Sequence, residues 1–330
     1  MPLDLRCERK RERMTIETIC PTDSTPLVAE TATSFRCPLC SRLYPERDGV
    51  LKFVARNDEF YEGAYQAQVS FLPRSERPWH AWPLWLISSG YLWMVRRFVP
   101  ARGLVVELGC GGGVKYFGRR YRMVGCDLSS SSLERLNGIY ERLLQVDAAE
   151  KLPLQDGTVD AVVSSFFWEH IPPGVKPRIL AECMRILKPG GRLIFLYDVE
   201  TDNPMIGHYK RRDPVLYRRL FLEGDGHLGY QSSSDNLRLF RSAGLSILAH
   251  RGIEKSWVQS GCVYEKLTAF GGVGRPIFRF ARILDRAPFF YLYTAVVRIV
   301  DALFGPLLPD RWARMVVTVC SKDGIATGEE

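Results

Sequence analysis

The sequence is poor in the features that mark a secreted domain held together by disulfides. Its nine cysteines are an odd number among 330 residues, and their spacing is scattered. Such a set does not form a disulfide framework, and several of these thiols fall in apolar runs where cysteine acts as a small hydrophobe. We therefore expect a reducing compartment and predict a cytoplasmic protein.

Long apolar runs without charge are also lacking. No stretch of about 18 uncharged apolar residues occurs, so the sequence predicts no membrane-spanning helix. The nearest candidate, residues 287–309, is interrupted by Arg298 and Asp301. Residues 1–14 have no apolar segment of signal-peptide length, and we expect them to form a flexible basic tail.

The overall composition is that of a globular protein, with 46% hydrophobic, 25% charged and 12% aromatic residues. The length predicts about two domains. The net charge of +8 permits an anionic partner such as RNA, a nucleotide or a membrane surface, and does not choose between them.

A glycine cluster stands at the centre of residues 105–129, which read VVELGCGGGVKYFGRRYRMVGCDLS. The preceding run, 104–108, is predicted to be a buried parallel strand. Glycine permits a ligand to approach the backbone, and such loops lie at the edge of the sheet where doubly wound folds bind ligands. A dinucleotide fingerprint would require glycine at position 114, where Val114 stands, which argues against a nicotinamide-dependent oxidoreductase.

Strand-like and helix-like segments alternate after residue 100, which predicts an α/β fold with a parallel sheet. Two further strands are expected after residue 200, separated by a long apolar segment that we expect to be helical. The predicted strands are 104–108, 122–128, 161–166, 192–199, 245–250 and 314–321, and the predicted helices include 131–144 and 176–188.

Four motifs in this region resemble those of the class I S-adenosylmethionine (SAM)-dependent methyltransferases. The pattern Glu107-x-Gly109-x-Gly111-x-Gly113 is similar to the family's motif I. The second strand ending on Asp127, the segment 146–172 and the segment 186–195 match later motifs in order. The resemblance covers roughly residues 100–200. It implies a doubly wound, Rossmann-like, seven-stranded sheet whose last strand, 314–321, is antiparallel.

The resemblance also implies SAM as the cofactor. In the family, the first acidic residue and the loop amides hold the methionine end, and the acid after the second strand accepts hydrogen bonds from the ribose hydroxyls. The acid after the third strand lies beside the adenine, and the fourth strand ends beside the methyl group. The implied cofactor-binding residues are Glu107, Gly109, Gly111, Gly113, Asp127, Leu128, Asp147, Ala148 and Ser165.

Methyl transfer from a sulfonium mainly requires alignment of the nucleophile and exclusion of water, and a hydroxyl nucleophile also benefits from a general base. The candidate catalytic residues are His170 and His227, with Glu169 and His208 as further possibilities. The family motif Asp/Asn-Pro-Pro-Tyr/Phe, used on exocyclic amines, does not occur after the fourth predicted strand. That argues against methylation of base amines.

Residues 36–53 resemble the small zinc-ribbon-like domain that accompanies several methyltransferases. Cys37 and Cys40 form a C-x-x-C pair, and the partner pair would be Cys20 and Asp23. Because zinc also accepts carboxylate oxygen, these four residues are a candidate structural metal site. A ribbon that has lost its metal is the alternative.

The predicted organisation is a ribbon domain over 15–55, an aromatic helical linker over 56–100 and a methyltransferase domain over 101–330 with a helical cap insert at about 255–311. We expect methyl transfer to a hydroxyl or carbon of a small-molecule or lipid-linked acceptor. The alternatives are a ribosomal RNA methyltransferase and a non-catalytic SAM-binding regulator. The apolar, arginine-containing segment 276–304 suits peripheral membrane contact. The sequence does not indicate an oligomeric state.

Overall fold

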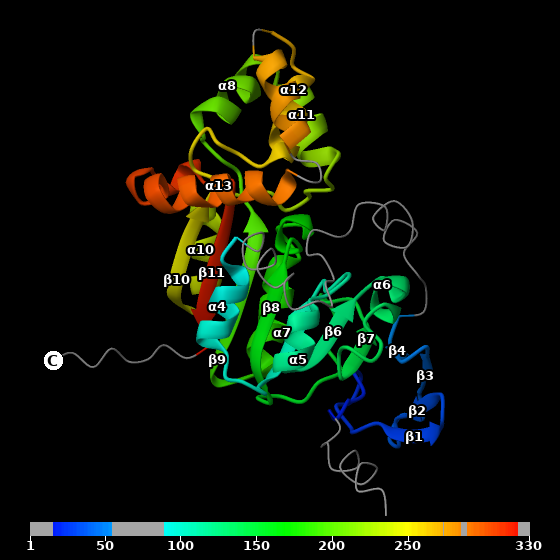
Figure 1. Cartoon of the computed structure of the whole chain (residues 1–330). Helices are drawn as coiled ribbons and strands as arrows, with labels where there is room; N and C mark the ends of the chain where they lie inside the picture. Colours follow the sequence, from blue (N-terminus) through cyan, green and yellow to red (C-terminus); the bar gives the residue numbers. More distant parts are fainter. Residues whose placement is uncertain (1–15, 55–88, 273, 285–288, 323–330) are drawn as a thin grey trace, which may run out of the picture.

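The computed structural model describes residues 16–54, 89–272, 274–284 and 289–322, and its centre is an eleven-stranded sheet (Figure 1). The strands follow the order β1-β2-β3-β4-β7-β6-β5-β8-β9-β11-β10. Their bounds are β1 Val28–Thr31, β2 Ser34–Arg36, β3 Leu43–Arg47, β4 Val50–Lys52, β5 Leu104–Leu108, β6 Arg122–Asp127, β7 Arg142–Gln145, β8 Val159–Ser165, β9 Leu187–Asp198, β10 Ser246–Ile253 and β11 Met315–Ser321.

Seven of these strands form the doubly wound sheet that the sequence predicts. Strands β7, β6, β5, β8 and β9 are parallel, and β11 lies antiparallel between β9 and β10. The antiparallel placement of the last strand is therefore confirmed. The count of seven needs correction, because β4 pairs in parallel with β7 and so joins the N-terminal ribbon to the sheet. Strand β4 thus covers the edge of the sheet at β7, and its residues Val50 and Leu51 are buried there.

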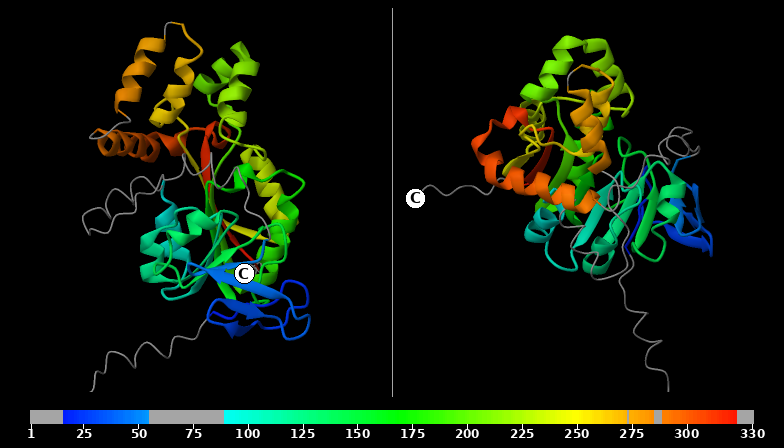
Figure 2. Two further views of the ribbon diagram at one scale, coloured as in Figure 1. Left: turned by 90° about the vertical axis from the view of Figure 1, so that its right-hand side faces the viewer. Right: turned by 45° about the horizontal axis from the view of Figure 1, so that its top comes forward.

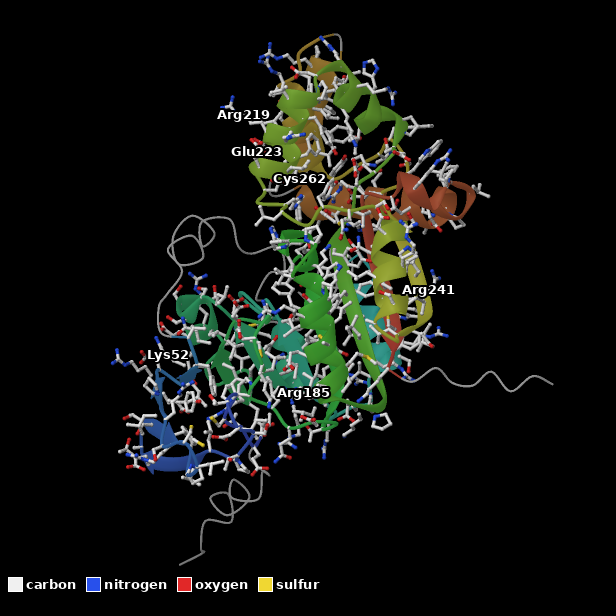
Figure 3. All side chains as sticks on the ribbon, turned by 180° about the vertical axis from the view of Figure 1, so that it is seen from behind. Lys52, Arg185, Arg219, Glu223, Arg241 and Cys262 are labelled. Carbon is white, nitrogen blue, oxygen red and sulfur yellow. The ribbon has the colours of Figure 1, made fainter. Side chains whose placement is uncertain are left out.

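Helices cover both faces of the sheet. On one face lie α4 (Tyr91–Phe98), α5 (Lys115–Arg120) and α6 (Ser130–Glu134). On the other lie α7 (Lys176–Ile186) and α10 (Ser233–Ser242), which Figure 3 shows from behind with Arg185 and Arg241 labelled. The buried residues of α7 recur with helical spacing, as expected for a helix with one face on a sheet.

A helical cap stands beyond one end of the sheet (Figure 2). It contains α11, α12 and α13 from the range 255–311, where a helical insert was predicted, together with α8, α9 and η3. These elements share a small aromatic core that includes Tyr209, Tyr264 and Phe278. The bounds are α8 Pro204–Arg212, α9 Pro214–Tyr217, η3 Arg218–Glu223, α11 Gly261–Thr268, α12 Arg275–Leu284, α13 Phe290–Phe304, η4 Gly305–Leu307 and η5 Asp310–Trp312.

The predicted helix over 131–144 is wrong in its second half. Helix α6 ends at Glu134, Gly138 takes a left-handed conformation, and Arg142–Gln145 is strand β7. Pairing with β4 and β6 decides this segment, because tertiary contacts override a local preference for helix.

Two predicted segments lie largely outside the described residues. The tail 1–14 is not described, and within the predicted linker 56–100 the structure describes only 89–100, which contain α4.

Candidate functional site

The glycine loop connects β5 to α5 at the carboxyl edge of the parallel strands. Gly109, Gly111 and Gly113 have φ values of 58°, 46° and 58°, a region that favours glycine. At Gly109 space is restricted as well, because a Cβ there would overlap the ring of Phe167, which follows β8. The loop is therefore shaped by three left-handed residues and packs directly against the next segment of the sheet edge.

Asp127, at the end of β6, fixes the loop in place. Its Oδ2 accepts a hydrogen bond from the Gly111 N–H at 2.8 Å, and its Oδ1 accepts one from the Ser129 N–H at 2.9 Å. Each carboxylate oxygen has a second lone pair, so the group retains capacity to accept from vicinal hydroxyls. The predicted ribose-binding residue thus lies beside the loop, as the resemblance requires.

Glu107 is buried within β5 and lies below the same loop. Burial raises the pKa of its carboxyl group to about 8, while a hydrogen bond from the Tyr140 hydroxyl lowers the pKa and the charge of Asp127 raises it. The Tyr140 oxygen in turn accepts from the Val114 N–H at 2.9 Å. The sequence analysis missed Tyr140, since it lies 33 residues from Glu107 and no local motif links the two.

The remaining predicted cofactor residues lie along the same edge. Gln145 donates to the Leu128 carbonyl at 2.9 Å, and the Asp147 carboxylate accepts from the N–H two residues on at 2.8 Å. Asp147 and Ala148 follow β7, and Ser165 is the last residue of β8. All nine predicted cofactor-binding residues are thus on or beside β5, β6, β7 and β8, around the glycine loop.

The two predicted catalytic histidines come together although they are 57 positions apart in the sequence. The ring centroids of His170 and His227 are 5.2 Å apart. His170 Nδ1 lies 3.0 Å from the Gly226 carbonyl oxygen, and His227 Nε2 lies 4.0 Å from Oδ2 of Asp198, the last residue of β9. By contrast, His208 is exposed on α8.

Glu169 is buried and the two histidines are half-buried, and this burial governs the protonation of the cluster. Burial lowers the pKa of both imidazoles, and burial together with the charge of Asp198 raises the pKa of Glu169 well above its ordinary value. His227 Nδ1 and Glu169 Oε2 are buried without a hydrogen-bond partner among the residues that the structure describes. One ligand atom each from Glu169, His170 and His227 lies within 4.8 Å of the others. The cluster can accept a proton from a hydroxyl or hold a cation.

Three members of this region were missed by the sequence analysis. Asp198 ends β9 much as Asp127 ends β6, so an acid at a strand end was an available signal. Tyr230 stacks on His227 with ring centroids 5.1 Å apart. Arg314, directly before β11, contacts both Asp198 oxygens at 3.2 Å and Glu254 at 2.8 Å. Only the folded sheet brings these three residues together.

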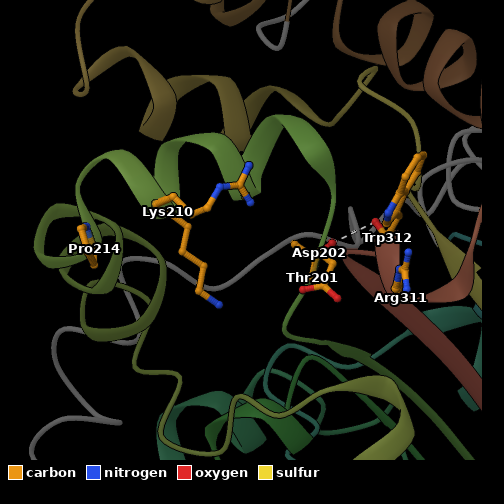
Figure 4. A pocket seen from close by; sticks show the side chains of 8 residues that line it. Thr201, Asp202, Lys210, Pro214, Arg311 and Trp312 are labelled. Atoms are coloured by element: carbon orange, nitrogen blue, oxygen red, sulfur yellow. Dashed lines mark hydrogen bonds between the residues drawn. The ribbon is translucent and has the colours of Figure 1, made fainter.

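A pocket of about 550 Å³ lies between the end of β9 and the cap (Figure 4). Thr201 donates from its hydroxyl to the Trp312 carbonyl at 2.9 Å across it. Lys210, whose ammonium forms an ion pair with Glu200, lies 5.5 Å over the ring of Tyr217. The lining residues are Thr201, Asp202, Gly207, Lys210, Arg211, Pro214, Arg311 and Trp312.

The four candidate metal ligands of the ribbon also converge. One ligand atom each from Cys20, Asp23, Cys37 and Cys40 lies within 4.8 Å of the others. The sulfurs of Cys20 and Cys40 are 3.6 Å apart, and the Cys37 sulfur is 3.2 Å and 3.4 Å from the two Asp23 oxygens. Tetrahedral zinc with bonds of about 2.3 Å to sulfur and 2.0–2.2 Å to oxygen separates its ligand atoms by roughly 3.5–3.8 Å. The donor set therefore fits zinc.

Comparison with known proteins gives one family and several partial relatives. Residues 106–195 match the family described as "Methyltransferase domain". The tRNA N(3)-methylcytidine methyltransferase Mettl2 of Drosophila melanogaster is 26% identical over 43% of this chain and 48% of its own length. The ubiquinone/menaquinone biosynthesis C-methyltransferase UbiE of Desulfotalea psychrophila is 29% identical over 42% of this chain and 63% of its own.

One solved structure illustrates the structural likeness. The geranyl diphosphate C-methyltransferase of Streptomyces coelicolor, in complex with Mg²⁺, geranyl diphosphate and S-adenosylhomocysteine, has a TM-score of 0.46 and 13% identity. The likeness covers 77% of this chain and 89% of that one. The chain thus matches less than two thirds of the length of either curated relative. With the strand order, the glycine loop and the acids at the strand ends, the family match identifies residues 106–195 as a SAM-dependent methyltransferase domain of class I.

Proposed function

We propose that the protein transfers a methyl group from SAM to a hydroxyl or carbon of a small-molecule or lipid-linked acceptor. One observation supports this most directly. The glycine loop and the histidine cluster meet at one sheet edge, because Phe167 packs on Gly109 and is followed within three residues by Glu169 and His170. The cofactor loop thus lies next to the segment that carries Glu169 and His170, and His170 in turn contacts His227.

The residues around the loop fit SAM. When bound, SAM supplies an activated methyl group on a positively charged sulfur. Asp127 would accept from the ribose hydroxyls, and Asp147 would lie beside the adenine. Glu107 would face the methionine end, where a carboxylate favours a cationic ammonium. Phe167 would exclude water from the loop.

His227 is the residue that we assign as general base. Its Nδ1 is buried without a partner among the described residues, and burial keeps the imidazole neutral by lowering its pKa. A hydroxyl held beside Nδ1 would give its proton to this nitrogen as its oxygen attacks the methyl carbon. The Asp198 carboxylate, 4.0 Å from Nε2, would stabilise the resulting imidazolium. For an acidic carbon acceptor the same nitrogen would take the C–H proton.

The pocket beside β9 favours an acceptor with a negative charge. Arg211 and Arg311 line it together with Lys210, which is paired with Glu200, against a single lining carboxylate, Asp202. The name of the UbiE relative, a C-methyltransferase of quinone biosynthesis, supports a lipophilic acceptor. An RNA acceptor is not favoured, because residues 164–170, at the end of β8 and just after it, read SSFFWEH and lack the prolines used for base amines.

The test begins with calorimetric titration of SAM and S-adenosylhomocysteine into the wild type and Asp127→Ala. Binding in the wild type and its loss in the variant are expected. Wild-type protein and His227→Gln are then incubated with radiolabelled SAM and separate fractions of polar metabolites, lipids and RNA. Label in metabolites or lipids, reduced in His227→Gln, supports the proposal. Label in RNA alone would refute the acceptor class, and absence of SAM binding would refute the enzyme.

We also propose that Cys20, Asp23, Cys37 and Cys40 hold a structural zinc ion. Four protein ligands would leave no open position, so the metal would stabilise the ribbon without taking part in methyl transfer. Elemental analysis of purified protein is expected to show one zinc per chain, lost in Cys37→Ser. The control Cys262→Ser changes a thiol of the cap and should retain the metal. Zinc-free wild type that melts at the same temperature after zinc addition would contradict the assignment.

A further inference from the structure

Helix α13 exposes an apolar face and buries a face that contains polar residues, which is the opposite of a helix that packs on the core of a soluble protein. Thr294, Val297 and Asp301 are its buried side chains. The opposite face exposes an apolar stripe with spacing of four, three and four residues, which keeps its members on one side of a helix. The stripe consists of Leu292 (68% exposed), Val296 (44%), Ile299 (57%) and Leu303 (64%).

Hydrogen bonds and ion pairs attach the buried face of α13 to Glu254, which follows β10. Both Asp301 oxygens accept from the Glu254 N–H at 2.9 Å, and Arg298 lies 3.4 Å from Glu254 and from Asp301. These contacts fix which side of the helix faces the protein. They also leave the apolar stripe outside, so its exposure follows from the fold.

Helix α12 repeats the pattern beside it. Phe278 packs inward against Tyr209 and Tyr264, while Ile277, Phe280 and Ile283 are exposed at intervals of three residues. Figure 2 shows α12 and α13 on the same side of the molecule, at the left of its left-hand view. The exposed large apolar side chains of this segment form what we call the cap patch: Ile277, Phe280, Ile283, Phe289, Tyr291, Leu292, Val296, Ile299, Leu303, Phe304 and Leu307.

The charge of the segment indicates what covers the cap patch. Residues 275–304, which span α12 and α13, contain five arginines against two acidic residues, and one arginine and one acid of this set, Arg298 and Asp301, pair on the buried face. Arg275 and Arg279 are exposed on α12 among its apolar side chains. Apolar helices with interleaved cations and exposed aromatic residues match the composition of helices that lie in the interface of an anionic bilayer.

A spanning arrangement fits less well, although Phe290–Leu307 is long and apolar enough by length and composition, with a mean hydropathy of 1.4. The sequence analysis named residues 287–309 as the nearest candidate but predicted no membrane-spanning helix. Spanning would remove Arg298 and Asp301 from Glu254 and place both charges in hydrocarbon, which is costly.

We propose that the cap patch docks the protein on the surface of an anionic lipid bilayer, with α12 and α13 lying in the plane of the interface. The apolar stripes would enter the boundary of the acyl chains, and Arg275 and Arg279 would contact anionic headgroups. This surface is distinct from the methyltransferase site, so the proposal stands or falls separately from the proposed reaction.

The experiment is flotation of the full-length protein with vesicles of phosphatidylcholine, with or without phosphatidylglycerol. We expect flotation with the anionic vesicles that weakens with salt. The double variant Leu292→Asp/Ile299→Asp should reduce the partition coefficient by about tenfold or more, because two apolar anchors become anionic. Val28→Asp, an exposed position on β1 outside the cap patch, is the matched control and should float like the wild type.

Two further measurements keep the outcomes distinct. Arg275→Glu/Arg279→Glu should lose the preference for anionic vesicles, and the melting temperature and SAM affinity of every variant show whether it is folded. Failure of wild type to float, or equal flotation of the Leu292→Asp/Ile299→Asp variant, would overturn the proposal. A concentration-dependent increase in mass that this variant abolishes, without flotation of the wild type, would assign the patch to self-association.

Discussion

The raised pKa of Glu107 predicts that SAM binding depends on pH. With a pKa of about 8, the Glu107 carboxyl group is mostly protonated in the free protein at pH 7. A ligand ammonium should favour the ionised form, so only that fraction of the protein is ready to bind. The observed dissociation constant then exceeds the intrinsic one by the factor 1 + 10^(pKa − pH), which is about 100 at pH 6 and about 11 at pH 7.

Affinity for SAM should therefore increase about ninefold between pH 6 and pH 7. Binding at pH 7 should release about 0.9 proton per SAM, which calorimetry in buffers of different ionisation enthalpy measures directly. The range stays below pH 7.5 because an α-amino group itself titrates at about 7.7–8.0.

Two variants test the cause of this dependence. Glu107→Gln should bind with little change between pH 6 and pH 7. Tyr140→Phe should move the dependence to higher pH, since the Tyr140 hydrogen bond lowers the pKa of Glu107 and its loss raises it. A flat profile in the wild type, or an unchanged slope in Glu107→Gln, would refute the assignment of Glu107 to the ammonium.

Three other predictions concern the loop, the base and the cap. Gly109→Ala should abolish SAM binding, because the added Cβ would overlap the ring of Phe167. The control Gly138→Ala, also at positive φ but with open space around it, should bind SAM normally and lose only about 1–2 kcal/mol of stability in urea unfolding. Equal SAM binding by both variants would contradict the role of the close contact. His227→Gln should lower kcat about 100-fold without changing SAM affinity. Wild-type kcat/KM should fall as pH drops through a pKa below 6.5, because burial lowers the pKa of the His227 imidazole. A rate that rises on acidification would exclude His227 as the general base. Glu254→Gln should cost about 3–5 kcal/mol at pH 7, since it takes one of two carboxylate partners from each of Arg314 and Arg298. Because the pKa of Glu254 is about 2 against 4.5 in the unfolded chain, this difference is present above pH 4.5 and should shrink as pH falls towards 2. A penalty that persists at pH 2 would argue against the ion pairs.

The cofactor loop was accessible from the sequence because its determinants are local. A buried strand, glycines at fixed spacing and an acid at the end of the next strand are written in consecutive residues, and the fold brings them together at a sheet edge. Asp127 needs only the adjacent strand to reach the Gly111 N–H.

Long-range partners could not be predicted in this way. Tyr140 reaches Glu107 only because the segment after α6 turns back beneath the glycine loop. Local preference also misread this segment as helix, since pairing of Arg142–Gln145 with β4 depends on a ribbon about 90 residues earlier. Helix α5 is short, and Gly118 within it has a packing reason that the sequence conceals: a Cβ there would overlap the Ile139 carbonyl oxygen.

The buried charges link the cap to the edge of the sheet that carries the histidine cluster. Asp198 faces His227 and is held by Arg314, which also binds Glu254; Glu254 in turn engages Arg298 and the end of α13. A buried cation that loses one of two carboxylates must reorient or unfold its surroundings, because an unpaired buried charge is costly. The position of Asp198 beside His227 therefore depends on the same contacts that hold α13 on the sheet. It follows that removal of the cap should disturb the histidine cluster even if every residue of the SAM loop stays in place.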